Sequence, residues 1–109
     1  MWNEPCSATL GRMPALYATE HLPWRDKIIY EHFFIGGSDW YAAECDPVER
    51  VCFGYAILNL DYQNAEWGYF SLGELASIKI RGVEVDRDLH WRPRPAGTID
   101  DIVRGMSRR

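Results

Sequence analysis

The chain has 109 residues, of which 47% are hydrophobic and 14% aromatic, and its net charge is −4. This length suits one domain, and this composition excludes an intrinsically disordered chain. No apolar run of about 18 residues occurs, which excludes a membrane-spanning helix. The first residues lack the basic and apolar regions of a signal peptide, so we expect a cytoplasmic protein.

The charge is unevenly distributed along the chain. Residues 1–86 hold six Lys or Arg against thirteen Asp or Glu, a net charge of −7, and residues 87–109 hold six against three, a net charge of +3. The acidic part disfavours a broad phosphate-binding face, because such a face needs clustered Lys and Arg. The C-terminal arginines Arg104, Arg108 and Arg109 could contact nucleic acid, or could only solvate the end of the chain.

Residues 1–13 lack periodicity and are predicted to form a flexible N-terminal arm. Alternation and a high content of aromatic and β-branched residues then predict four strands, over residues 27–35, 40–45, 51–60 and 66–70. Gly36-Gly37-Ser38-Asp39 and Asp46-Pro47-Val48-Glu49 predict the first two turns. The 51–60 strand is apolar on both faces and should lie inside the sheet, where Gly54 indicates a close approach by a neighbouring aromatic residue or a bulge.

The rest of the chain predicts two short helices and a further strand. Ser71 and Glu74 form a capping box, which predicts a helix over residues 72–78 that ends near Arg81-Gly82. Residues 83–91 are a predicted fifth strand, and Thr98 is the predicted N-cap of a helix over 98–106. The fold class is therefore α+β, an antiparallel β-meander of about five strands with one or two short helices packed on it. The predicted parts are the arm (1–13), one domain (14–95), and a C-terminal helix with a basic tail (96–109).

The predicted fifth strand carries the most suggestive polar group. In a strand, Glu84, Asp86, Asp88 and His90 would point to the same side. Asp86, Asp88 and His90 could bind a divalent ion in a small hydrolase or nuclease, although ligands about 7 Å apart on one strand would need others from elsewhere. The alternative is a solvated face that contacts a protein partner, for which the candidate residues are Glu66, Glu84, Asp86, Asp88 and Trp91.

No catalytic motif accompanies these residues. The serines lack the G-x-S-x-G signature, no phosphate-binding loop occurs, and no cofactor is expected. The cysteines Cys6, Cys45 and Cys52 have no metal-like spacing; Cys45 and Cys52 could face each other across a hairpin and are expected as reduced thiols. The aromatic residues could form a platform on which nucleic-acid bases stack, but their acidic neighbours would repel phosphate. They are therefore expected mainly to pack the core.

A series of short motifs suggests a family. In chain order they are Tyr17-Ala-Thr-Glu20, Asp26-Lys27-Ile28, His32-Phe33-Phe34, Asp39-Trp40-Tyr41, Phe53-Gly54-Tyr55, Trp67-Gly68-Tyr69-Phe70-Ser71-Leu72 and Arg87-Asp88-Leu89. Over about residues 14–93 they resemble a bacterial family called domain of unknown function 2958. The resemblance implies a short protein coded on a plasmid or integrative element, with no established activity, cofactor or catalytic residue.

Three hypotheses follow. The first is a non-enzymatic protein-binding accessory factor of a mobile genetic element, such as an anti-CRISPR or anti-restriction inhibitor, whose acidic body faces a positively charged channel. The second is the metal-dependent hydrolase or nuclease. The third is a nucleic-acid accessory protein that acts through the basic C-terminus.

Overall fold

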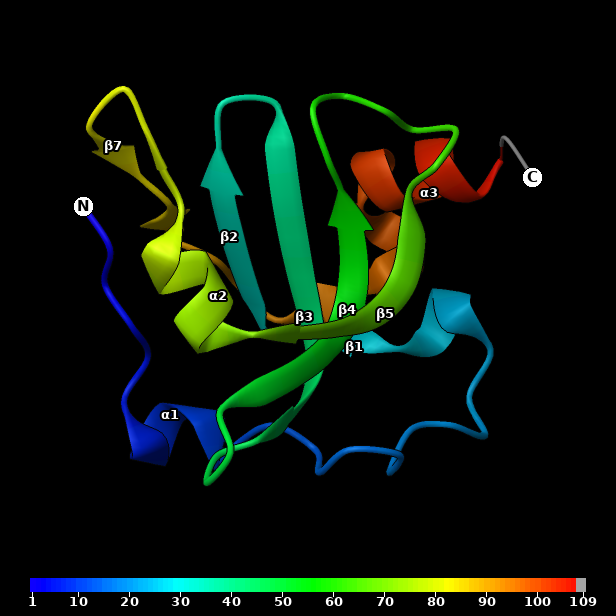
Figure 1. Ribbon diagram of the computed structural model, residues 1–109. Coiled ribbons are helices and arrows are strands. Elements are labelled where there is room, and N and C mark those ends of the chain that lie inside the picture. Colours follow the sequence, from blue (N-terminus) through cyan, green and yellow to red (C-terminus); the bar gives the residue numbers. More distant parts are fainter. Residues whose placement is uncertain (108–109) are drawn as a thin grey trace.

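A five-stranded antiparallel sheet forms the centre of the computed structural model, which describes residues 1–107 (Figure 1). The strands lie in the order β5-β4-β3-β2-β8. Their bounds are β2 (Glu31–Ile35), β3 (Ser38–Asp46), β4 (Val51–Ile57), β5 (Glu66–Ser71) and β8 (Asp86–Arg87). Four consecutive strands form a meander, and β8 joins the edge beside β2. The predicted α+β meander is confirmed.

The two predicted turns fix the register of the first three strands. Gly36 and Gly37 join β2 to β3, with Ile35 opposite Ser38, and Gly36 has a left-handed φ of 53° that glycine adopts without strain. At the next turn Asp46 Oδ1 accepts from the backbone N–H of Val48 and Glu49 at 2.9 and 3.1 Å. Such Asx bonds satisfy turn N–H groups that no strand can pair.

Gly54 lies where β3 and β4 approach each other most closely. A Cβ built on Gly54 would stand 1.9 Å from the carbonyl oxygen of Tyr41, closer than any real contact. The register between the two strands shifts between Ala42 and Glu44, directly beside this position. The expected bulge therefore lies beside Gly54, and the close approach is made by the backbone carbonyl of Tyr41 and not by an aromatic ring.

Helix α2 (Leu72–Ser77) follows β5 as predicted, and Ser71 Oγ accepts from the N–H of Glu74 at 2.9 Å. Beyond it the prediction is wrong in two respects. Residues 79–84 form a hairpin of β6 (Lys79–Ile80) and β7 (Val83–Glu84), because Arg81 and Gly82 both take positive φ and make a tight turn. The long strand over 83–91 is replaced by β7, the two-residue β8 and a turn.

The remaining elements lie at the two ends of the chain. They are α1 (Ser7–Leu10), η1 (Trp24–Asp26), β1 (Ile28–Ile29), β9 (Arg94–Pro95), η2 (Ala96–Thr98) and α3 (Asp100–Met106). Thr98 does not cap α3: its hydroxyl donates to the carbonyl of Pro95 at 2.6 Å, and Ile99 takes the N-cap position. In the predicted N-terminal arm, Leu10 and Met13 are buried.

Each face of the sheet has its own hydrophobic core. The side chains of α2 and of the N-terminal segment pack on one face, with Leu10, Phe33, Cys52 and Leu72 among the core residues. We call residues 24–29 and 91–107 the C-terminal layer, because β1, β9, η2 and α3 cover the other face, which buries Tyr55, Ile57, Ile99 and Ile102. Figure 1 shows α2 in front of the sheet and α3 behind it.

The described helices are short, and none within residues 1–107 has the length and apolar character that a membrane crossing requires. The longest, α3, spans Asp100–Met106.

Candidate functional site

The predicted partner-binding residues lie at opposite edges of the sheet. Glu66 begins β5 at one edge, whereas Asp86 begins β8 at the other. With three strands between them and about 4.8 Å per strand spacing, roughly 19 Å of sheet separates the two edges. Trp91 is half-buried, and its indole N–H donates to the carbonyl of Ile29 at 2.9 Å. These residues do not form one contact surface.

The residues of the metal-site hypothesis do not converge either. Asp86 accepts from the Met1 amine at 2.7 Å, and Asp88 accepts from the backbone N–H of His90 at 3.0 Å in a turn that leaves His90 exposed. The second carboxylate oxygen of Asp88 lies 3.6 Å from Nδ1 of His32. Within residues 1–107, no three His, Cys, Asp or Glu side chains form a group suited to a metal ion.

Polar side chains also connect the sheet to the C-terminal layer. The Tyr41 hydroxyl donates to one oxygen of Asp101 at 2.8 Å, and Tyr62 donates to the other at 3.0 Å. Burial, and then the bond to Asp101, raise the pKa of the Tyr41 phenol far above its ordinary value. His32 stacks on Tyr41 with ring centroids 4.5 Å apart, and its Nε2 lies 2.8 Å from Asp39. The two bonds to Asp101 join the sheet and the loop after β4 to α3.

Cys45 and Cys52 face each other across two strands, as predicted. Cys45 lies directly opposite Cys52 on β3 and β4, and both thiols are free and buried in the core beneath α2. They are structural neighbours, out of reach of solvent.

A more complete binding site lies where the loop between α1 and η1 runs along one end of the sheet (Figure 1). There a pocket of about 240 Å³ opens to solvent. Its lining combines aromatic and charged side chains: Tyr17, Glu20, Lys27, Glu44, Phe53 and Tyr69. A concave site with aromatic walls and a few fixed polar groups is the usual form of a binding pocket.

Glu44 holds this loop in place from inside the protein. The side chain is only 2% exposed, and its carboxylate accepts from the backbone N–H of Tyr17 at 2.7 Å and of Thr19 at 3.1 Å. It also accepts from the Thr19 hydroxyl. A buried carboxylate is stable only with such a set of donors. Glu44 therefore fixes the position of Tyr17, whose φ of 73° is rare for a residue with a side chain.

Lys27 supplies the positive charge beside Glu44. Its ammonium donates to the carbonyl of Thr19 at 2.5 Å and to the Thr19 hydroxyl at 3.3 Å, and the residue is 8% exposed. Thr19 thus connects the buried ammonium to the buried carboxylate. Because these two formal charges offset each other, Glu20 at the rim makes the formal charge of the pocket lining negative.

Aromatic rings form the outer walls. Phe53 packs between Trp67 and Tyr69, with ring centroids at 6.0 and 5.1 Å, and Tyr17 lies 6.2 Å from Tyr69. A hydrogen bond with the Tyr17 hydroxyl raises the pKa of Tyr69. Tyr17 and Tyr69 are 63% and 54% exposed, which is high for aromatic residues held in fixed positions. The six described lining residues offer binding groups, and none of them is an activated nucleophile.

Part of this site can be recognised from the sequence motifs. Tyr17, Glu20 and Lys27 fall within the recognised motifs, but Glu44 reads as one more acidic residue in a strand. Only the strand pairing brings Glu44 and Phe53 together, and only the folded loop brings Tyr17 to them.

Comparison with known proteins gives one match. Residues 23–98 match the profile of a family described as "Protein of unknown function (DUF2958)". The matched range includes Lys27, Glu44, Phe53 and Tyr69 of the pocket and excludes Tyr17 and Glu20. No curated protein and no solved structure shows a significant match to the chain.

Proposed function

We propose that this chain, which belongs to the DUF2958 family of proteins of unknown function, binds another protein through its surface. The pocket beside Tyr17 and Tyr69 best supports a protein-binding module without catalytic activity. Exposed tyrosines in fixed positions are typical anchors of protein interfaces, since they bring a large contact area at a small entropic cost. The observation that carries the proposal is this pair of exposed tyrosines beside a pocket, with Tyr17 held by the buried Glu44 and Tyr69 by strand β5.

The pocket suits one cationic side chain of a partner. Its volume of about 240 Å³ is below the range of about 300–1,000 Å³ that is usual for small-molecule sites. Aromatic faces attract guanidinium and ammonium groups, and Glu20 adds a carboxylate at the rim. We therefore expect an arginine of the partner to lie between Tyr17 and Tyr69, with its charge near Glu20.

The acidic surroundings extend this preference to the whole partner. With a net charge of −7 over residues 1–86, this part of the chain would steer toward a basic protein surface. The finer form of the proposal is an accessory factor of a mobile genetic element that inhibits host defence, because nucleic-acid channels of such complexes are basic. Glu84, half-buried at the β6–β7 hairpin, would add a second contact.

Affinity capture with the tagged full chain tests the proposal. We expect one bacterial protein to be retained in stoichiometric amount at low salt and to be lost as salt rises. Tyr69→Ala and Glu20→Lys should each remove that same protein. Both positions are exposed, so neither change should disturb the fold, which circular dichroism can verify.

Two controls match these variants. Leu89→Ala removes an exposed apolar side chain from the turn after β8, and Glu74→Lys reverses an exposed charge on α2. Both should retain the partner. Equal capture by all four variants would reject the pocket as the contact, and capture of no specific protein would reject the binding function. For the finer proposal, adding the chain to the purified partner complex should inhibit its cleavage of DNA.

A further inference from the structure

The C-terminal layer carries a set of arginines that the fold does not use. Arg25, Arg92, Arg94 and Arg104 are all exposed. Within residues 1–107, none of the four forms an ion pair, whereas Arg50 and Arg87 pair with Glu4 and Glu31. Exposed guanidinium groups without carboxylate partners keep all their N–H donors available for an anionic ligand.

Three of these arginines lie over aromatic rings. The guanidinium carbon of Arg25 is 4.6 Å from the ring centroid of Trp24, that of Arg94 is 4.5 Å from Trp91, and that of Arg104 is 4.3 Å from Tyr62. All three rings are partly buried against the core of this face. The rings therefore hold the guanidinium planes in place while the N–H edges stay in solvent.

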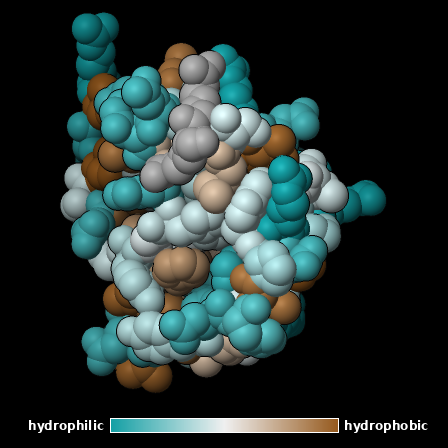
Figure 2. Space-filling view, turned by 90° about the vertical axis from the view of Figure 1, so that its right-hand side faces the viewer, coloured by the Kyte–Doolittle hydropathy of each residue, from teal (hydrophilic) through white to brown (hydrophobic). Residues whose placement is uncertain are grey.

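The three stacks are connected through the packing of the C-terminal layer on the sheet. Arg25 packs against Gly97 of η2, with its Cβ 3.2 Å from the position that a Cβ of Gly97 would take. The Trp91 ring lies 5.8 Å from the ring of Tyr41, and Tyr41 shares the Asp101 carboxylate with Tyr62. A line of contacts through the buried Tyr41 and through Asp101 thus connects the Arg94 stack to the Arg104 stack beneath the surface. Figure 2 shows the side toward α3, where hydrophilic and pale, intermediate residues interleave over much of the surface.

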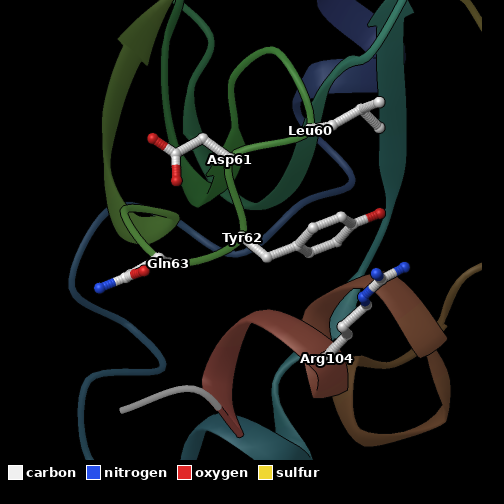
Figure 3. Close-up of a pocket in the computed structure, with 5 residues that line it drawn as sticks. All are labelled: Leu60, Asp61, Tyr62, Gln63 and Arg104. Atoms are coloured by element: carbon white, nitrogen blue, oxygen red, sulfur yellow. The ribbon is translucent and has the colours of Figure 1, made fainter.

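A hollow of about 330 Å³ opens beside the Arg104 stack. It is lined by Leu60, Asp61, Tyr62, Gln63 and Arg104, and Figure 3 shows the Arg104 guanidinium beneath the Tyr62 ring with Asp61 and Gln63 across from it. A planar base could lie in this hollow, since it offers an aromatic ring for contact and amide and carboxylate groups for its polar edge.

The charge of the layer differs from that of the remaining chain. The C-terminal layer holds five Lys or Arg against three Asp, a net charge of +2, and Arg108 and Arg109 of the tail add two more. Residues 1–23 and 30–90, which we call the acidic body, hold five Lys or Arg against thirteen Asp or Glu, a net charge of −8. Arginine and aromatic residues interleaved on one positive side are the features of a surface that follows a single strand.

We propose that the C-terminal layer binds single-stranded nucleic acid. Phosphates contact Arg25, Arg94 and Arg104, and a base enters the hollow beside Tyr62. The acidic body restricts the positive surface to this side, so a narrow, flexible strand fits better than a duplex, whose phosphates would extend over carboxylates. This function is independent of the pocket beside Tyr17.

Fluorescence anisotropy of a labelled twelve-nucleotide oligo(dT) with the full chain tests this inference. Binding should weaken as salt rises, with a slope of the log–log plot of about −0.7 for each phosphate contacted, so about −2 for three. Arg25→Gln, Arg94→Gln and Arg104→Gln should each lower the affinity and reduce that slope by about 0.7. Deletion of residues 96–109 is not a usable test, because it removes Ile99 and Ile102 from the core.

Two further variants, a duplex and a polyglutamate competitor test the location of the site and its preference for a single strand. Arg12→Gln, an exposed arginine of the acidic body, should leave the affinity unchanged, and Tyr62→Ala should lower it without changing the salt slope. Equal affinity for a duplex of the same length would overturn the single-strand preference. Full competition by polyglutamate, together with no effect of Tyr62→Ala, would indicate an acidic protein partner and overturn the proposal. Absence of oligonucleotide binding at millimolar protein and low salt would also overturn it.

Discussion

The acidic body and the C-terminal layer use their charged side chains in different ways. In the body, several charges serve the architecture: Glu44 holds a loop, and Glu31 and Glu4 pair with arginines. In the layer, three of the four arginines lie over rings at the surface, and none of the four makes an ion pair within residues 1–107. Buried charge must be satisfied by the fold, whereas exposed charge is free to act on a ligand.

The contrast predicts that the buried charges of the body stabilise the fold, whereas the exposed arginines of the layer act mainly in binding. Substitutions at buried, tightly packed positions of the body should therefore cost most in free energy of unfolding. Substitution of the layer's arginines should cost least, even where it abolishes binding.

The largest expected effect is at Gly54 in the body. Gly54→Ala places a methyl group 1.9 Å from the carbonyl oxygen of Tyr41, which cannot move without separating β3 from β4. We expect a loss of about 4 kcal/mol or more in the free energy of unfolding, measured by urea denaturation. The matched control is Gly68→Ala on the paired strand, where nothing lies within 4 Å of the added group. A change of at most about 1 kcal/mol is expected there. Similar losses at the two positions would show that the strands are less closely packed than described.

The next effect is at Glu44. Glu44→Gln removes the negative charge of the side chain whose oxygens accept from Tyr17 and Thr19, and the buried Lys27 ammonium loses the buried carboxylate that offsets its charge. We expect a loss of about 3 kcal/mol in the free energy of unfolding, because one member of a buried charged pair is lost. Glu49→Gln, at an exposed turn position, should change stability by less than about 0.5 kcal/mol. If both variants were equally stable, the buried acid would have no architectural role.

Much of the sheet can be predicted from local patterns. Gly36-Gly37 and Asp46-Pro47 specify turns by backbone preference, Ser71 caps α2 through its own side chain, and Gly54 marks a close approach. Each of these signals acts within a few residues, so no long-range information is needed. The β6–β7 hairpin has two-residue strands and a non-glycine residue, Arg81, at positive φ, and neither feature gives a periodic signal.

The site depends on pairings that the sequence does not specify. Nothing local indicates that β8 joins β2, so Glu66 and Asp86 could not be assigned to opposite edges. The pocket likewise joins Tyr17 to Glu44 across 27 positions. The arginine stacks could be found only partly, since Trp24-Arg25 are adjacent in sequence whereas Tyr62 and Arg104 meet through α3.

A smaller effect is expected where the two regions meet. Tyr41→Phe removes the bond to Asp101 and should lower the free energy of unfolding by about 2 kcal/mol at neutral pH. The pKa of Tyr41 is raised in the folded protein, so the folded state keeps its proton when the unfolded chain loses it. The stabilisation is therefore complete below pH 10 and is lost as pH rises above 10. Urea denaturation from pH 8 to 11 should show a shallower alkaline loss for Tyr41→Phe. An identical pH profile would mean that Tyr41 titrates normally.

The smallest effect on stability is expected at Arg94. Its guanidinium lies over Trp91 at the surface, and Arg94→Gln leaves the Trp91 bond to Ile29 intact. The free energy of unfolding should change by less than about 1 kcal/mol, which is the usual contribution of an exposed cation–π contact. The same substitution should lower the affinity for oligo(dT) and the salt slope of binding, so stability and binding separate at this residue. A large loss of stability with unchanged binding would reverse the roles assigned to the two regions, because the arginines would then belong to the architecture as Glu44 does.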